Sequence, residues 1–311
     1  MKFKNNTLKT TLLLSSVFFV PFLANKAAFF IAQKKYPFID AFYTYDWRLG
    51  KIGYSVRGNG KPVVLIHDAK PGSSSAVWLK NTESLAENYK VYTIDLLGYG
   101  TSERVNTTYT SYTYASMIDD FITDVVKRPA AVIAEGEGAM FAAEAYAKNP
   151  KNYKRLVLVC PKGINGTIAS NDNKKVRLIY ELPILGESLY LLNTTLTAVK
   201  NILCKMIYSD KKTKILTERF YAAAHHGGAL NRFPFASYKT GFMNTNIIPY
   251  IKSVKVPMLI VWGEKASDIS DFDEIQGLNE KAEYLLFEET ANLPNYENAD
   301  EFNKAVKEFL K

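Results

Sequence analysis

A regular alternation between short β-branched runs and segments with helical spacing is the feature that most constrains the fold. The β-branched runs lie at residues 63–67, 91–95, 131–134, 156–159, 258–262 and 284–287. The clearest helical segments between them lie at 84–88, 114–126, 139–148, 272–279 and 299–310. Short, mostly apolar runs suit parallel strands covered on both faces, and the intervening helices supply that cover. The chain is therefore predicted to be an α/β protein with a mostly parallel sheet and helices on both faces.

Two segments depart from this alternation. Residues 42–58 alternate apolar and polar side chains around Gly50, which predicts an antiparallel hairpin. Residues from about 166 to 250 contain helical runs without a clear buried strand. This pattern indicates a helical cap insertion over the carboxyl ends of the strands, where open α/β sheets bind ligands. The chain has 311 residues, 47% of them hydrophobic, which is enough for one domain with a hydrophobic core. We expect this domain over 36–311, preceded by a separate segment over 1–35.

The first 35 residues resemble a targeting or anchoring segment. Lys2, Lys4 and Lys9 precede an apolar run over 12–24, in the order found in secretory signals. Residues 11–31 are long enough to span a bilayer. We expect an uncleaved membrane anchor over 11–31, with the domain extracytoplasmic because the three lysines favour a cytoplasmic N-terminus. A cleaved signal and a helix that packs on the domain are the alternatives.

Composition excludes several classes of function. The net charge is +8, but Lys and Arg are scattered among 31 acidic residues without a nucleic-acid motif, so a basic face near an anionic membrane explains the charge better. Cys160 and Cys204 are too few for a disulfide framework or a cysteine zinc site, and we expect two unpaired, buried thiols, with one disulfide as the alternative. His67, His225 and His226 are the only histidines. No metal or other cofactor is expected.

Five motifs in order carry a resemblance to a known family. They are PVVLIHD (62–68), IDLLGYGTS (94–102), VIAEGEGAM (132–140), LIVWGEKA (259–266) and ETANLPNYENADEFNKAVKEFL (289–310). With these motifs the chain resembles the α/β-hydrolase superfamily over about residues 42–311. A Rossmann-like domain is the competing interpretation, because Gly136 and Gly138 follow a strand and open a helix. Phe141 stands where that fingerprint needs a third small residue, which argues against a dinucleotide site.

The resemblance implies a Ser-Asp-His triad whose positions carry other residues here. The nucleophile position of the G-x-S-x-G elbow is Gly136. The acid position is Ala266, with Asp268 two residues on as a substitute, and the histidine position is Asn292. An amide has no nitrogen that titrates near neutral pH, so Asn292 cannot take the proton of a nucleophile. Loss of nucleophile and base together removes the covalent route.

The remaining family positions are also altered. His67 keeps its place in the oxyanion loop, where it is usually structural, but Asp68 replaces the glycine that should follow. A carboxylate there should disfavour an anionic intermediate. Glu135 and Glu137 flank Gly136 and are expected to be solvated or paired acids. His225, in the expected cap, is a candidate base or ligand contact, although a structural role is the more common one for such a residue.

Three functional hypotheses follow. The leading one is a membrane-anchored, catalytically degenerate hydrolase homologue, a pseudohydrolase whose pocket under the cap binds a small apolar ligand or a protein partner. The second is an active esterase-like or lipase-like hydrolase with relocated groups, drawn from Ser73, Asp68, Asp268 and His225. The third is an interaction protein whose pocket is filled by its own side chains. None of the three involves nucleic acid.

Overall fold

The computed structural model describes residues 2–35, 43–165, 171–209 and 213–311. Its centre is an eight-stranded sheet in the order β1-β2-β4-β3-β5-β6-β7-β8. The strands are β1 (Tyr43–Trp47), β2 (Gly50–Arg57), β3 (Lys61–Ile66), β4 (Tyr89–Ile94), β5 (Ala130–Glu135), β6 (Tyr153–Val159), β7 (Met258–Gly263) and β8 (Ala282–Phe287). Strand β2 pairs antiparallel with β1 and β4, whereas the other neighbours pair parallel. The predicted mostly parallel sheet and the hairpin are confirmed; position 42, the expected start of the hairpin, lies outside the described residues.

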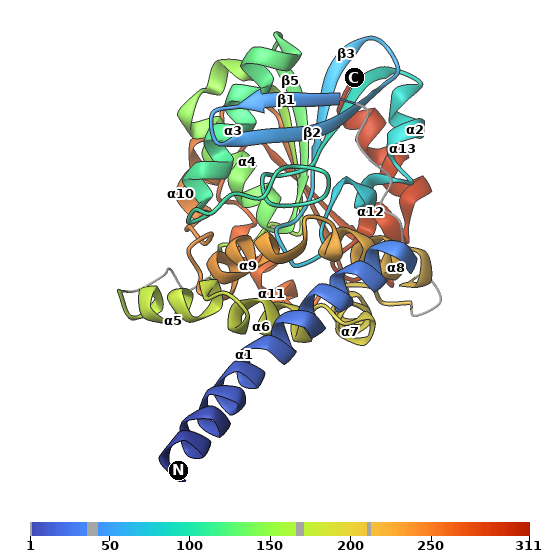
Figure 1. The fold of residues 1–311 in the computed structure, drawn as a ribbon. Helices are drawn as coiled ribbons and strands as arrows, with labels where there is room; N and C mark the ends of the chain where they lie inside the picture. The colour runs from blue at the N-terminus through green and yellow to red at the C-terminus, as the bar shows by residue number, and fades with distance from the viewer. Residues whose placement is uncertain (1, 36–42, 166–170, 210–212) are drawn as a thin grey trace.

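Helices cover both faces of this sheet. On one side lie α3 (Ser111–Phe121), α4 (Gly136–Lys148) and α10 (Ile248–Ser253); on the other lie α2 (Thr82–Ala86), α12 (Pro294–Glu297) and α13 (Ala299–Phe309) (Figure 1). The short α11 (Ile269–Ile275) follows β7. Because helices cover both faces, the central strands bury nearly every side chain, and Val63, Val64 and Leu65 of β3 are fully inaccessible. This burial explains why the sequences of the parallel strands are mostly apolar and do not alternate with polar residues.

The segment of the chain between β6 and β7 forms a layer of helices. It comprises α5 (Asn171–Glu181), α6 (Leu185–Asn193), α7 (Leu196–Met206), α8 (Thr213–His225) and α9 (Arg232–Lys239), and α10 on the sheet face follows it. Helices α5, α6, α7 and α9 lie beyond one end of the sheet (Figure 1). Residues 166–170 and 210–212 of the expected cap, and 36–42 at the expected start of the domain, lie outside the described residues. Cys160 is buried after β6 and Cys204 is half-buried on α7, so the expected burial is found for Cys160 only; the two residues are not joined by a disulfide.

The first helix, α1 (Lys2–Lys35), packs on this helical layer through its C-terminal half. Asn25 Nδ2 donates to the Ile184 carbonyl and to Ser188 Oγ, each at 3.1 Å. Gln33 Nε2 donates to the His225 carbonyl at 2.8 Å, and Phe29 is buried between them. These contacts are those expected of a helix that packs on the domain. Across the described residues, no helix combines the length and the apolar character needed to cross a bilayer.

The start of α4 presses closely against the end of β3. A Cβ atom added to Gly138 would lie 2.3 Å from the His67 carbonyl oxygen, which is far inside van der Waals contact. Only glycine lets the two backbones approach this closely. The same approach brings the loop after β3 beside the turn that opens α4.

We predict that Gly138→Ala destabilises the fold by about 2 kcal/mol or more, because a backbone atom, not a flexible side chain, occupies the space. Gly277→Ala is the matched control: Gly277 has a left-handed φ of 75° but open space around its Cβ position, so only the backbone strain of about 1 kcal/mol applies. Urea unfolding of the three chains measures both effects. Equal losses for the two variants would show that the close approach is not needed.

Candidate functional site

The end of β3 and the turn between β5 and α4 meet at Asp68 and Gly136. Gly136 has a left-handed φ of 57°, a conformation that side chains with a Cβ rarely adopt. A Cβ atom at this position would also lie 2.5 Å from Asp68 Cγ. The backbone angle therefore favours glycine at position 136, and the space that the Asp68 carboxyl group fills excludes a side chain there.

Two backbone N–H groups hold the Asp68 carboxylate. Asp68 Oδ1 accepts hydrogen bonds from the N–H groups of Ala69, at 2.8 Å, and Glu137, at 3.0 Å. In the α/β-hydrolase fold that the sequence predicts, the oxyanion hole consists of two such backbone N–H groups. One belongs to the residue after the nucleophile and the other to the loop after β3. Asp68 is 1% exposed. A carboxylate oxygen of the chain itself thus takes the place in which an oxyanion would be bound.

Lys70 neutralises this carboxylate. Its ammonium forms an ion pair with Asp68 Oδ2 and lies 3.2 Å from Glu137 Oε2. Lys70 is not among the residues predicted from the sequence, because those predictions concern the triad positions, the two glutamates beside Gly136, and His67 and Asp68 of the loop. Its place two residues beyond Asp68 was the available signal, since both residues lie in the loop at the carboxyl end of β3.

Glu135 is a second buried acid beneath Asp68. Its Oε1 accepts the Asp68 N–H at 3.0 Å, and the residue is 1% exposed. Burial, and next the charge of Asp68, raise the pKa of Glu135 to about 8, although Lys70 opposes the shift. Glu135 therefore holds a proton near neutral pH; of the two expected states, solvated or paired, it is not solvated, and its hydrogen-bond partner is the Asp68 N–H.

Asn292 and Asp268 form the third part of the site. Asn292 Nδ2 donates to Asp268 Oδ1 at 2.8 Å. Lys162 forms an ion pair with Asp268, and its backbone N–H donates to the Gly136 carbonyl at 3.1 Å, which ties this pair to the turn. Ala266, the position matched to the family's acid, is buried and offers only a methyl group. The side chain that reaches Asn292 is therefore that of Asp268.

Asp268 is held in its charged form. Burial raises the pKa of this carboxyl group, but the Lys162 ammonium and the Asn292 amide outweigh burial, and the net pKa lies below its ordinary value. Lys162, like Lys70, was missed by the sequence analysis. It follows the carboxyl end of β6 closely, and the corresponding positions of neighbouring parallel strands share one edge of the sheet.

His67 is a structural residue. Its Nε2 accepts the Leu96 N–H at 2.9 Å, and its Nδ1 lies 2.5 Å from the Asp68 carbonyl oxygen, to which it donates. Both nitrogens of the neutral ring are thereby used. Burial lowers the pKa of His67, in keeping with this neutral form. The ring joins the loop after β3 to the loop after β4.

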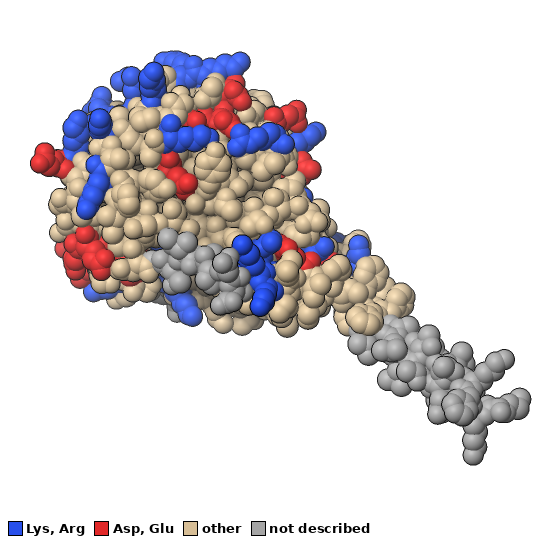
Figure 2. Space-filling view, turned by 90° about the vertical axis from the view of Figure 1, so that its left-hand side faces the viewer, with Lys and Arg blue, Asp and Glu red and all other residues tan. Residues whose placement is uncertain are grey.

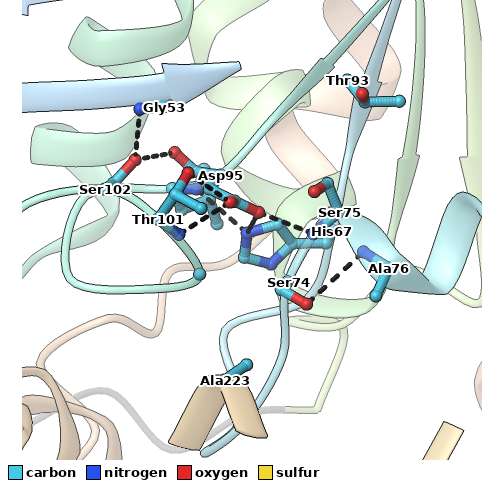
Figure 3. Close-up of polar contacts among 12 residues, drawn as sticks. Gly53, His67, Ser74, Ser75, Ala76, Thr93, Asp95, Thr101, Ser102 and Ala223 are labelled. Atoms are coloured by element: carbon cyan, nitrogen blue, oxygen red, sulfur yellow. Dashed lines mark hydrogen bonds and ion pairs between the residues drawn. The ribbon is translucent and has the colours of Figure 1, made fainter. Parts of the chain in front are cut away.

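Asp95 organises the loop after β4 (Figure 3). Its carboxylate accepts the Ser75 N–H at 2.7 Å, and the N–H and hydroxyl of Thr101, each at 2.8 Å. The Ser102 hydroxyl donates to the Asp95 carbonyl at 2.6 Å and accepts the Gly53 N–H at 2.9 Å. The motif that contains these residues therefore supports the site by fixing its loops.

Ser73 and His225 have surroundings of their own. Ser73 Oγ is buried and has no hydrogen-bond partner among the described residues. The His225 ring donates from Nδ1 to the Tyr221 carbonyl at 2.8 Å and packs edge-on against Phe29 of α1, with 5.9 Å between ring centroids. Burial lowers the pKa of His225. These contacts place His225 at the junction of α1 and α8.

A pocket of about 270 Å³ connects the site with the helical layer. Its polar lining from the sheet side is Lys70, Lys162, Ser267 and Asn292. The rest of its lining is Pro71, Asn193, Ile202, Lys205, Met206, Phe235, Tyr238 and Lys239. Apolar walls and four ammonium groups suit a small ligand with an apolar body and an anionic head.

A comparison with known protein families finds a match over most of the chain. The family model described as "alpha/beta hydrolase fold" matches residues 62–290. Pimeloyl-[acyl-carrier protein] methyl ester esterase of Aliivibrio fischeri (strain MJ11) is 30% identical over 141 residues, which are 42% of this chain and 52% of that protein. A 2-hydroxy-6-oxononadienedioate/2-hydroxy-6-oxononatrienedioate hydrolase of Pseudomonas sp is 22% identical over 84% of this chain and 92% of its own length. The chain thus spans about half of the esterase and most of the second relative.

Solved structures show the same fold. A serine hydrolase involved in carbazole degradation (CarC enzyme) superposes with a TM-score of 0.73 at 17% identity, covering 88% of this chain and 98% of that one. A membrane phospholipase A described as a bacterial virulence factor superposes with a TM-score of 0.68 at 18% identity, covering 99% and 98%. At these identities the likeness concerns the fold alone.

The raised pKa of Glu135 predicts a pH-dependent stability. The folded chain keeps this proton up to about pH 8, whereas the unfolded chain releases it near 4.5, so the contribution of Glu135 to stability falls as pH rises between these values. Glu135→Gln keeps the acceptor for the Asp68 N–H and cannot ionise. We expect the loss of unfolding free energy between pH 5 and 8 to be smaller in this variant by on the order of 2–4 kcal/mol. Urea unfolding at both pH values tests this, and parallel changes in the two chains would contradict it.

Proposed function

The chain belongs to the alpha/beta hydrolase family, and we propose that it is a degenerate member that uses the pocket for binding and does not hydrolyse esters. The observation that carries this proposal is the Asp68 carboxylate, whose Oδ1 accepts both the Ala69 and Glu137 N–H groups. A developing oxyanion would have to displace a charged group that is already well bound there. Gly136, beside it, has no hydroxyl to act as a nucleophile.

A working hydrolase with relocated groups has less support. Such an enzyme needs a nucleophile and a base within hydrogen-bond reach of each other. His225 Nδ1 is committed to the Tyr221 carbonyl, and its ring packs against α1. Asp268 is paired with Lys162 and Asn292, and Asp68 with Lys70. The carboxylates are therefore engaged in fixed pairs, an arrangement that favours a binding role.

The lining of the pocket refines the class of ligand. Ile202, Met206 and Phe235 offer apolar contact, which fits the small apolar ligand expected from the sequence. Lys205 and Lys239 are exposed among the lining residues. Lys70 and Lys162 are held by carboxylates, but each ammonium has three donors, so a ligand could use those that remain. A carboxylate or phosphate head on a short apolar body satisfies both kinds of lining; a protein partner remains the alternative occupant.

The proposal includes attachment to a membrane through residues 11–31, with the domain on the extracytoplasmic side. The apolar run over 12–24 behind Lys2, Lys4 and Lys9 supports it. The exposed Phe18, Phe19 and Val20 on α1 support it as well, because side chains of this kind are costly to leave in water.

We predict that the full chain is not labelled by a serine-reactive fluorophosphonate and does not hydrolyse p-nitrophenyl butyrate. The combined change Asp68→Gly, Gly136→Ser and Asn292→His should gain labelling at position 136, with Asp268 already placed to support the new histidine. Gly136→Ser with Asn292→His should remain unlabelled, because the added Cβ meets Asp68 Cγ at 2.5 Å. Circular dichroism checks that each variant is folded. Stoichiometric labelling of one serine in the natural chain would favour the active hydrolase.

Calorimetry with octanoate and octanol tests the class of ligand. Octanoate should bind more tightly, and Lys205→Gln with Lys239→Gln should weaken its binding by about 2- to 10-fold, as expected for exposed charges. Lys154→Gln is the matched control, since Lys154 is exposed on β6 and does not line the pocket. Equal affinity for the alcohol would reject the anionic head. No binding of either compound would count against the pocket as a binding site.

A further inference from the structure

Exposed large apolar side chains concentrate on α1 and on the helical layer. On α1 they are Phe18, Phe19, Val20, Phe22, Leu23, Phe30 and Ile31. On and beside α5 to α8 they are Val176, Leu178, Ile179, Leu182, Leu185, Leu192, Leu196, Tyr208 and Ile215. Leu178 is 56% exposed and Leu182 48% exposed, values far from those of core side chains. Exposed large apolar side chains gathered on neighbouring helices point to a contact surface, because soluble proteins seldom expose large apolar patches.

The two groups of side chains lie at the same end of the molecule. Helices α5, α6 and α7 lie at the end of the domain from which α1 projects (Figure 1). The hydrogen bonds from Asn25 to Ile184 and Ser188 join α1 to the start of α6. Leu182 and Leu185 therefore lie beside the part of α1 that also exposes Phe22. Lys and Arg side chains lie at the opposite end of the domain and also near the base of α1 (Figure 2).

The chemistry of this end favours lipid as the occupant. Helix α1 leads directly from the helical layer into the apolar run over 12–24. Lys26, Lys34 and Lys35 on α1, and Lys174 and Lys175 on α5, lie among the apolar side chains along the two helices. Lysines can lay their apolar stems along such a surface while their ammonium groups reach anionic headgroups. A mixture of Phe, Leu and Lys on adjoining helices is typical of interfacial membrane contact.

We propose that α1 and the exposed apolar side chains of α5 and the start of α6, Val176, Leu178, Ile179, Leu182 and Leu185, form one interfacial membrane-binding surface. The proposal rests on the membrane attachment proposed for residues 11–31 and adds a second element to it. The domain then rests on the bilayer with its helical layer toward the lipid. Because α7 and α9 of this layer line the pocket, an amphiphilic ligand would reach the pocket from the bilayer surface.

Vesicle partitioning of the full chain measures the contribution of the helical layer. The probe is phosphatidylcholine vesicles with about a third phosphatidylglycerol, titrated so that binding is not saturated. The combined change Leu178→Ser, Ile179→Ser and Leu182→Ser should lower the partition coefficient by about tenfold. Leu79→Ser with Leu286→Ser is the matched control, since these residues are similarly exposed elsewhere, and it should leave partitioning unchanged. Equal partitioning of both variants and the natural chain would overturn the proposal.

Quenching by brominated lipid gives a second readout that does not depend on affinity. Trp47, Trp78 and Trp262 are buried, so a tryptophan placed on the surface dominates the quenching. Fluorescence should be quenched for Leu182→Trp and not for Leu79→Trp. If the chain partitions but Leu182→Trp is not quenched, attachment through α1 stands and the role of α5 and α6 is rejected. If the natural chain does not partition at all, both proposals fail.

Discussion

The site depends on one interaction, the acceptance of two backbone N–H groups by the Asp68 carboxylate. Those donors converge because α4 starts against the end of β3, an approach that Gly138 permits. Gly136 leaves the space that the carboxyl group fills, and Lys70 balances its charge. In a buried place such a charge persists only when it is paired and hydrogen-bonded. The glycine at the nucleophile position and the acid in the loop after β3 thus depend on each other, because the Asp68 carboxyl group occupies the space that Gly136 leaves.

The fold could be predicted from the sequence because its signals are local and repeated. Buried runs such as 63–67 and 258–262 predict strands, and their order with the helices limits the topology. The motif positions likewise located Gly136 and Asn292. The direction of the Asp68 side chain could not be predicted, because it depends on the space left by a residue 68 positions away. The ion pairs of Lys70 and Lys162 could not be predicted for a similar reason. Each lysine needs carboxylate partners that come close only at the edge of the folded sheet.

Ala266, His225 and Glu135 show the same limit of prediction from the sequence. Ala266 was matched to the acid position by counting from the WGEK motif, with Asp268 named as its substitute, and only the folded turn before α11 shows that Asp268 reaches Asn292. His225 was a candidate for the pocket, but its ring packs against Phe29 of α1, a contact between segments nearly 200 positions apart. Glu135 was expected to be solvated or paired because acids usually are. The structure buries it beneath Asp68, and this burial raises its pKa.

A degenerate site requires that Asp68 holds the two N–H groups that an oxyanion would need. Amide hydrogen exchange measures this claim directly, residue by residue, in the natural chain and in Asp68→Ala. The Ala69 and Glu137 amides should be protected in the natural chain and should lose protection in the variant. The Lys162 amide, which donates to the Gly136 carbonyl, should keep its protection in both and so show that the turn is intact. Unchanged exchange of Ala69 and Glu137 in the variant would contradict the account, because the carboxylate would then not be their acceptor.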